Sequence, residues 1–144
     1  MATAGRLSSG LCSVTFRQLD PAQVVMAAVA AGLDGIEWGA DVHVPAGDLA
    51  AAAAAARVTT DGGLRVASYG SYLFADEASR AAIGPVLDTA EALGTDLIRV
   101  WCPFGVEPSA PRPERDAVAD VLAEWPPPRR GGASRSTSSS MAAP

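Results

Sequence analysis

A junction of similar sequence recurs three times along the chain and decides its fold class. Each copy runs from a glycine into a short apolar segment that ends on an aromatic residue, at 32–38, 63–69 and 94–101. The centres of these segments, Ile36, Val66 and Ile98, are 30 and 32 residues apart. That spacing leaves room for one helix between consecutive strands, which is the rhythm of a βαβ unit. We therefore expect an α/β protein with a parallel sheet.

The remaining elements follow from turn and cap residues. Asp20 before Pro21 is a typical helix start, and Asp48 can cap a second helix rich in alanine. We expect strands at 11–16, 35–38, 65–69 and 97–101, and helices that begin at 21, 49, 76 and near 113. Gly84 and Pro85 lie inside the third predicted helix and indicate either a late start or a kink there.

Two folds share this rhythm, and the turn after the first strand separates them. A doubly wound nucleotide-binding sheet usually has a glycine-rich turn there, whereas residues 17–20 contain no glycine. No Walker A pattern occurs either. A (β/α)8 TIM barrel is the better interpretation. Four units fill residues 11–125, and eight would need ~230 residues, close to the size of a typical barrel. The chain is thus expected to hold about four βα units, a truncated half barrel.

We divide the chain into a flexible N-terminus at 1–10, the half barrel at 11–125 and a disordered low-complexity tail at 126–144. The tail is rich in Pro, Arg, Gly and Ser and has no apolar periodicity. The chain lacks Lys and Asn but has 30 alanines, which indicates a gene of high G+C content. Such DNA read out of frame gives this kind of tail, so both a natural tail and a frameshift remain open.

The charge distribution bears on partners and location. The net charge is −5, and all 16 acidic residues lie in 1–125, which argues against a nucleic-acid surface. No apolar run reaches the ~18 residues of a membrane span. Residues 1–10 lack the apolar stretch of a signal peptide, so we expect a cytoplasmic protein without membrane contact.

Glu37 and Arg99 are the charged candidates inside predicted strands. A strand carboxylate can act as a general base, a metal ligand or an acceptor for sugar hydroxyls. It can equally be a structural acid paired with Arg65 or Arg99. Arg99 can bind a phosphate or carboxylate, and it shares one side of its strand with Trp101.

The remaining candidates are His43 and the aromatic residues. His43, the only histidine, can face a pocket together with Asp41 or can simply cap its loop. Trp38, Tyr69, Tyr72 and Trp101 can form a wall on which sugar rings stack, or can pack in the core.

Several of these segments together resemble a known family. Residues 11–17, 32–39, 41–45, 65–70 and 98–101 look like the sugar phosphate isomerase/epimerase family. This family belongs to the xylose isomerase-like TIM barrel superfamily, which also holds endonuclease IV. The segment Gly-Leu-Asp-Gly-Ile-Glu-Trp at 32–38 is the most distinctive part of the match.

The resemblance implies a barrel that interconverts sugars or sugar phosphates through an enediolate. It also implies one divalent metal, Mn, Mg, Co or Zn, held by ligands from strands five to eight. None of those strands is expected here, so we expect no metal ligand and no bound metal in this chain. The positions carried over as substrate-binding are Glu37, Trp38, His43, Arg99 and Trp101.

Three hypotheses about function therefore stand side by side. The first is an isomerase or epimerase by descent that is inactive as this chain, with a small sugar as its ligand. The second is a non-catalytic truncated or frameshifted fragment, which can self-associate through exposed sheet edges. The third is an endonuclease IV-like metal-dependent nuclease, which the single histidine disfavours.

Overall fold

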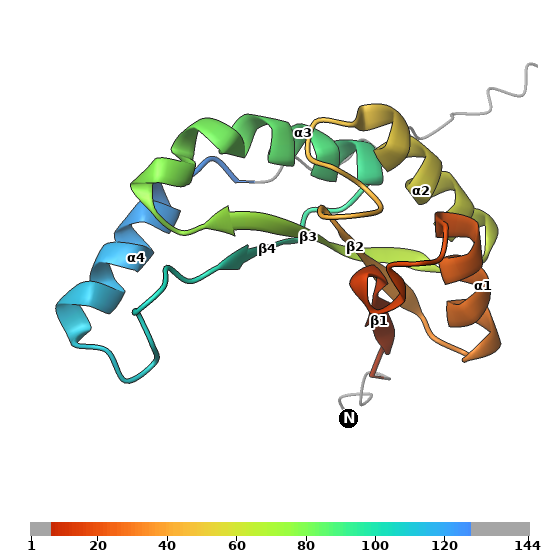
Figure 1. Ribbon diagram of the computed structural model, residues 1–144, viewed down its shortest axis with the longest axis horizontal. Coiled ribbons are helices and arrows are strands. Elements are labelled where there is room, and N and C mark those ends of the chain that lie inside the picture. Colours follow the sequence, from red (N-terminus) through yellow and green to blue (C-terminus); the bar gives the residue numbers. More distant parts are fainter. Residues whose placement is uncertain (1–6, 128–144) are drawn as a thin grey trace, which may run out of the picture.

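The computed structural model describes residues 7–127, which form one curved parallel sheet with helices along one side (Figure 1). Strands alternate with helices throughout, as the sequence predicts. The strands are β1 (Gly10–Cys12), β2 (Gly35–Gly39), β3 (Arg65–Phe74) and β4 (Ile98–Trp101). The α-helices are α1 (Pro21–Ala30), α2 (Leu49–Asp61), α3 (Ile83–Leu93) and α4 (Arg112–Glu124), and two 3-10 helices are η1 (Ser13–Phe16) and η2 (Glu77–Ala82).

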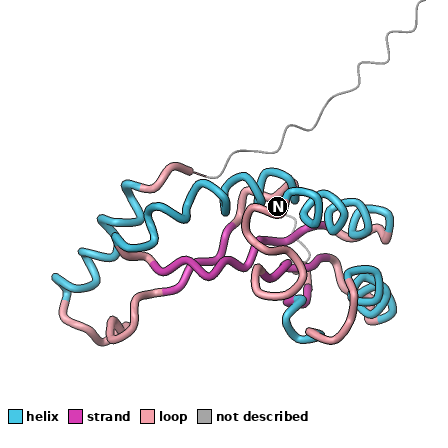
Figure 2. The backbone as a smooth tube through the Cα atoms, turned by 45° about the horizontal axis from the view of Figure 1, so that its top comes forward, coloured by secondary structure: helices cyan, strands magenta, loops and turns pink. Residues whose placement is uncertain are grey.

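The sheet has the order β1-β2-β3-β4, and every neighbouring pair is parallel. The helices α1, α2 and α3 follow the outer, convex side of the curve, and the inner side faces away from them (Figures 1 and 2). Each strand is followed by a helix before the next strand begins. This arrangement is half of a (β/α)8 barrel, in which the helices form the outer ring.

The cap residues act as the sequence predicts. The Asp20 carboxylate accepts a hydrogen bond from the Gln23 backbone N–H, and the Gln23 side chain returns one to the Asp20 backbone, which completes a capping box. The Asp48 carboxylate likewise accepts a hydrogen bond from the backbone N–H of Ala51 and so caps α2. Gly94 ends α3 with φ of +75°, a left-handed conformation that favours glycine.

Two strand boundaries differ from those predicted by more than one residue. The first strand ends at Cys12 rather than at residue 16, because the chain turns into η1. At that turn the Ser13 hydroxyl accepts a hydrogen bond from the Gly39 backbone N–H, which ties the end of β1 to β2. The third strand continues five residues further than predicted, to Phe74.

The third helix begins late, which was one of the two predicted alternatives. Residues Glu77–Ala82 form η2, and the α-helix starts only at Ile83. Pro85 then lies in the first turn of α3, where backbone N–H groups have no hydrogen-bond partner within the helix. The lack of an N–H at Pro85 therefore removes no helical hydrogen bond. The helix therefore does not need to kink around the proline.

The core lies between the sheet and the convex helices. Ile36 and Trp38 of β2 and Tyr69 of β3 are fully buried there. The Trp38 indole Nε1–H donates to the Thr59 hydroxyl at 3.0 Å, so its one polar group is satisfied. On α2 the buried side chains include Ala52 and Ala55, whose small size brings that helix close to the sheet and to α3.

The helix α4 differs from the others because none of its residues is buried. It is attached through the ion pair between Arg80 and Glu124 and through Val118 and Val121, which are half-buried. Among residues 7–127, no helix combines the length and the apolar character needed to cross a membrane. The predicted tail at 126–144 lies, apart from its first two residues, outside the described part of the chain.

The bond between Trp38 and Thr59 gives a test of the core. Thr59→Val keeps the shape of the side chain but leaves the buried indole N–H without an acceptor. We expect the free energy of unfolding to fall by about 1–3 kcal/mol. Thr60→Val is the matched control, because Thr60 is the next residue of α2 and is exposed. Equal destabilisation by the two variants in urea unfolding would contradict this role of Thr59.

Candidate functional site

A polar cluster lies on the concave side of the sheet, opposite the core. Successive residues of a strand alternate between the two faces, so Glu37 points to the concave side while Ile36 and Trp38 point into the core. One oxygen of the Glu37 carboxylate lies 3.0 Å from both the Cys12 Sγ and the Arg99 Nε. The other accepts a 2.7 Å hydrogen bond from the Ser68 hydroxyl. Glu37 thus connects all four strands.

This environment keeps Glu37 ionised. Burial by itself raises the pKa of the Glu37 carboxyl, because a charge is less stable away from water. The hydrogen bonds from Cys12, Ser68 and Arg99, together with the positive charge of Arg99, outweigh that effect and lower the pKa below its ordinary value. Burial, and after it the hydrogen bond to Glu37 and the negative charge of that carboxylate, raise the pKa of the Cys12 thiol, although the charge of Arg99 acts in the opposite direction. Cys12 is therefore a neutral donor.

Gly70 provides the space in which the charged pair crosses β3. A Cβ at this position would lie 2.6 Å from the Arg99 Nη2 and 3.0 Å from the Glu37 Oε1. Any side chain there would push the guanidinium and the carboxylate apart. The glycine that follows Ser68 and Tyr69 is thus required by the ion pair between β2 and β4.

Two aromatic rings extend this cluster along the concave side. The Arg99 guanidinium lies 4.9 Å from the centroid of the Trp101 ring, a cation–π contact. The Trp101 ring in turn lies 6.4 Å from the Tyr72 ring. Both side chains keep nearly half of their surface exposed, so they present open apolar faces beside a cation.

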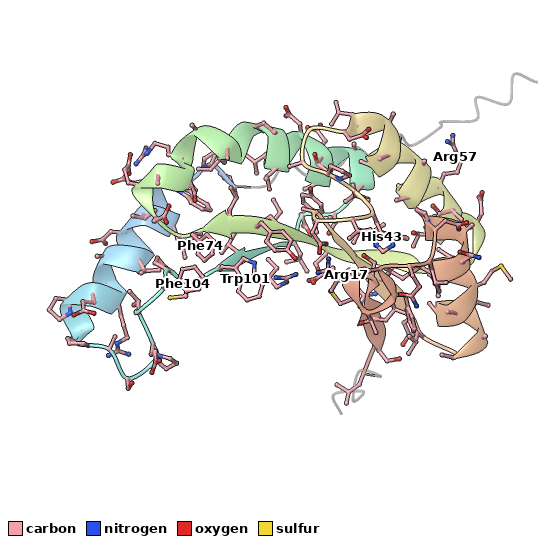
Figure 3. All side chains as sticks on the ribbon, in the orientation of Figure 1. Arg17, His43, Arg57, Phe74, Trp101 and Phe104 are labelled. Carbon is pink, nitrogen blue, oxygen red and sulfur yellow. The ribbon has the colours of Figure 1, made fainter. Side chains whose placement is uncertain are left out.

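The loops after β1 and β2 meet at the edge where the strands end. Arg17 forms an ion pair with Asp41, and a hydrogen bond to Tyr72 is the main reason that the pKa of Arg17 is raised. Arg17 and Trp101 appear on the same side of the sheet (Figure 3). This edge, at the carboxyl ends of the strands, is where barrel enzymes carry their active sites.

His43 fastens these two loops to each other. Its Nε2 lies 3.0 Å from the Leu19 carbonyl oxygen, which can only accept, so Nε2 carries the proton. Its Nδ1 lies 3.0 Å from the Ser13 hydroxyl, which also accepts from the Gly39 N–H. With the proton of the neutral imidazole on Nε2, Nδ1 is the acceptor, so the Ser13 hydroxyl donates this hydrogen bond. The His43 ring is buried and hydrogen-bonded at both nitrogens, so its role here is to hold the two loops together.

The structure brings together three of the five predicted substrate-binding residues. Glu37, Arg99 and Trp101 share the concave side. Trp38 lies on the opposite, helix-covered side, and His43 lies between the loops at the edge. The predicted aromatic wall is split in the same way, because Tyr69 is buried with Trp38 while Tyr72 accompanies Trp101.

Arg17 was not among the residues predicted for the site, and its ion pair with Asp41 was not predicted either. The available signal was position: both residues lie in the loops directly after predicted strands, where barrel chemistry is concentrated. Arg65 and Arg99 were the two predicted alternatives for the partner of Glu37. In the structure the partner is Arg99.

The divalent metal implied by the resemblance does not fit the residues at this site. Within residues 7–127, no group of three or more His, Cys, Asp or Glu side chains is placed to hold a metal ion. The Glu37 oxygens already accept from a thiol, a hydroxyl and a guanidinium, and the His43 nitrogens are both engaged. The described residues therefore offer no free set of ligands for a divalent metal at this site.

Comparison with known proteins gives the fold its context. No family model and no curated protein matches the sequence. Among solved structures, the chain is similar to the probable 3-DHS dehydratase AsbF, involved in petrobactin synthesis, from Bacillus anthracis. The TM-score is 0.61 at 17% sequence identity, and the match covers 81% of this chain and 46% of that one. It is also similar to a xylose isomerase domain protein from Planctomyces limnophilus, with a TM-score of 0.55 and 13% identity over 83% of this chain and 49% of that one.

The chain spans about half the length of both structures. At this level of identity the likeness concerns the fold alone. The four βα units match about half of the fold of each of these two structures, which confirms the predicted fold class, half of a TIM barrel.

The ion pair of Glu37 predicts how stability depends on pH. A carboxyl whose pKa is lowered by folding stabilises the protein above its unfolded pKa, about 4.3, and this stabilisation is lost as the pH falls through the folded pKa. We expect Glu37→Gln to lower the free energy of unfolding by about 1–3 kcal/mol at neutral pH. The deficit should shrink once the pH falls below the unfolded pKa, as measured by urea unfolding at a series of pH values.

Glu77→Gln is the matched control, because Glu77 pairs with Arg80 on the exposed surface. Exposed pairs of this kind contribute about 0–1 kcal/mol. A Glu37→Gln variant that is as stable as the Glu77→Gln variant at neutral pH would show that the concave ion pair does not stabilise the sheet.

Proposed function

We propose that this chain supplies the substrate-recognition side of an isomerase- or epimerase-like barrel that acts on a sugar or sugar phosphate. The observation that carries the proposal is the cluster of two arginines and two exposed aromatic rings on the concave side: Arg17, Arg99, Tyr72 and Trp101. The resemblance to the sugar phosphate isomerase/epimerase family and the fold of the solved neighbours support it.

The chemistry of these groups suits a polyhydroxylated anion. Guanidinium groups bind phosphate and carboxylate through paired hydrogen bonds. Arg99 uses its Nε proton on Glu37 and has further N–H donors on its terminal nitrogens. The apolar face of a sugar ring can pack on Trp101 and Tyr72, whose exposed rings lie beside that cation.

Recognition, rather than proton transfer, is the role that suits Glu37. An efficient general base has a pKa near the working pH, and the pKa of Glu37 lies below even the ordinary carboxyl value. Its oxygens also accept hydrogen bonds from three neighbours. We accordingly propose that these four βα units bind and orient the substrate and do not by themselves abstract a proton.

A nuclease activity is less well supported by the described residues. Phosphodiester cleavage in the endonuclease IV-like manner needs several metal-ligating histidines, and His43 is occupied in fixing two loops. The acidic charge of residues 1–125 also repels a nucleic-acid backbone.

The proposal is tested by calorimetric titration of the full chain with ribulose 5-phosphate and with unphosphorylated ribulose. We expect the phosphate ester to bind more tightly, and Arg17→Gln to weaken its binding about 10- to 100-fold, as expected when a charge-assisted hydrogen bond is lost. Arg57→Gln is the control, because Arg57 is an exposed residue of α2 that points away from the concave side (Figure 3).

Four results would count against the proposal. Equal affinity for the phosphorylated and the unphosphorylated sugar would remove the role of the arginines, as would equal losses in the Arg17 and Arg57 variants. Epimerisation of the sugar phosphate by this chain at ordinary enzymatic rates would show that the described residues, or others in the chain, carry out catalysis as well as recognition. No binding to either sugar would favour the non-catalytic alternative.

A further inference from the structure

Both edges of the described sheet expose unpaired strand backbone. In the order β1-β2-β3-β4, β1 pairs only with β2 and β4 only with β3. The Tyr69 N–H donates to the Leu97 carbonyl and the Ala75 N–H donates to the Trp101 carbonyl. Leu97 and Trp101 thus direct their carbonyl groups toward β3. Because the backbone groups of successive residues alternate between the two edges of a strand, the N–H and C=O groups of Ile98 and Val100 point away from β3, toward the open edge. Such an edge is a template for another parallel strand.

The side chains near β4 are also unusually exposed for their type. Leu97, just before the strand, is 59% exposed, and Phe104, just after it, is 92% exposed. The helix α4 beside them has no buried residue, and its Leu122 is exposed. In a closed barrel this helix lies between β4 and the next strand, which would cover its apolar side.

Enclosing the concave side does not leave Glu37 or Arg99 as an unpaired charge. Glu37 and Arg99 neutralise each other within one chain, so a second half placed opposite brings its own neutral pair. Burying an unpaired charge would be costly, whereas burying a hydrogen-bonded pair is tolerated.

We propose that a second copy of this chain completes the barrel, with β4 of each copy paired to β1 of its partner. A two-fold axis along the barrel keeps all strands parallel and forms this contact twice, so that four strands from each copy give the eight of a closed barrel. The chain spans 46% and 49% of two solved neighbours, which is the share that two copies need. This inference does not depend on the proposed function.

Sedimentation of the full chain over a wide concentration range tests the proposal. We expect the mass of two 14.6 kDa chains, with dissociation on dilution. Val100→Pro removes an N–H that faces the open edge and that β3 does not use, so the variant should sediment as a monomer with unchanged circular dichroism. Val100→Ala keeps the N–H and should remain a dimer. A monomeric wild type, or a dimeric Val100→Pro variant, would overturn the proposal.

Hydrogen exchange of the wild type decides the matter even if the proline variant fails to fold. In the dimer, the amides of Ile98 and Val100 should be protected, and this protection should disappear on dilution in step with the loss of mass. Fast exchange of both amides in a sample that sediments as a dimer would place the interface elsewhere and overturn the proposal.

Discussion

A parallel sheet must bury or satisfy both of its faces, and the ion pair between Glu37 and Arg99 meets that requirement on the concave side. The convex side is covered in the ordinary way, by apolar residues packed against helices. Within residues 7–127, the helices α1, α2 and α3 leave the opposite side uncovered (Figures 1 and 2), so polar side chains there satisfy one another. The Glu37 carboxylate, on β2, accepts hydrogen bonds from side chains of β1, β3 and β4, so this one group links all four strands.

The same interaction connects the fold to the candidate site. Because the guanidinium is held by Glu37 over Gly70, it is fixed beside the Trp101 ring rather than free in solvent. A second fixed contact at the strand ends is made by His43, which links the loops that carry Arg17 and Asp41. Binding groups held in place by other contacts lose less conformational entropy when a ligand arrives.

The sequence predicted the succession of elements well, because helix caps and strand rhythm are local. Asp20 and Asp48 cap the starts of their helices and Gly94 ends α3, as their residue types predict. The position of Pro85 indicated a late helix start as one of two alternatives. Boundaries that depend on tertiary contacts were missed. The end of β1 depends on a hydrogen bond from Gly39 to Ser13, two residues that lie far apart in the sequence.

The site was only partly predictable for a related reason. Alternation along a strand shows that Glu37 and Trp38 face opposite sides, but not which side is the core. Sequence also left open whether Arg65 or Arg99 pairs with Glu37, because that choice depends on how neighbouring strands are aligned. The pair of Arg17 with Asp41 depends on two loops that His43 brings together, and loop geometry has no periodicity to read.

The most direct test of this account is a carbon-detected NMR titration of the Glu37 side-chain carboxyl in the folded chain. The account predicts a midpoint below the ordinary glutamate value of about 4.3, with the Arg99 guanidinium resonances shifting over the same pH range. A midpoint above that value would mean that burial outweighs the hydrogen bonds. Glu37 would then be a candidate proton carrier, and the ion pair could not be the interaction on which the sheet depends.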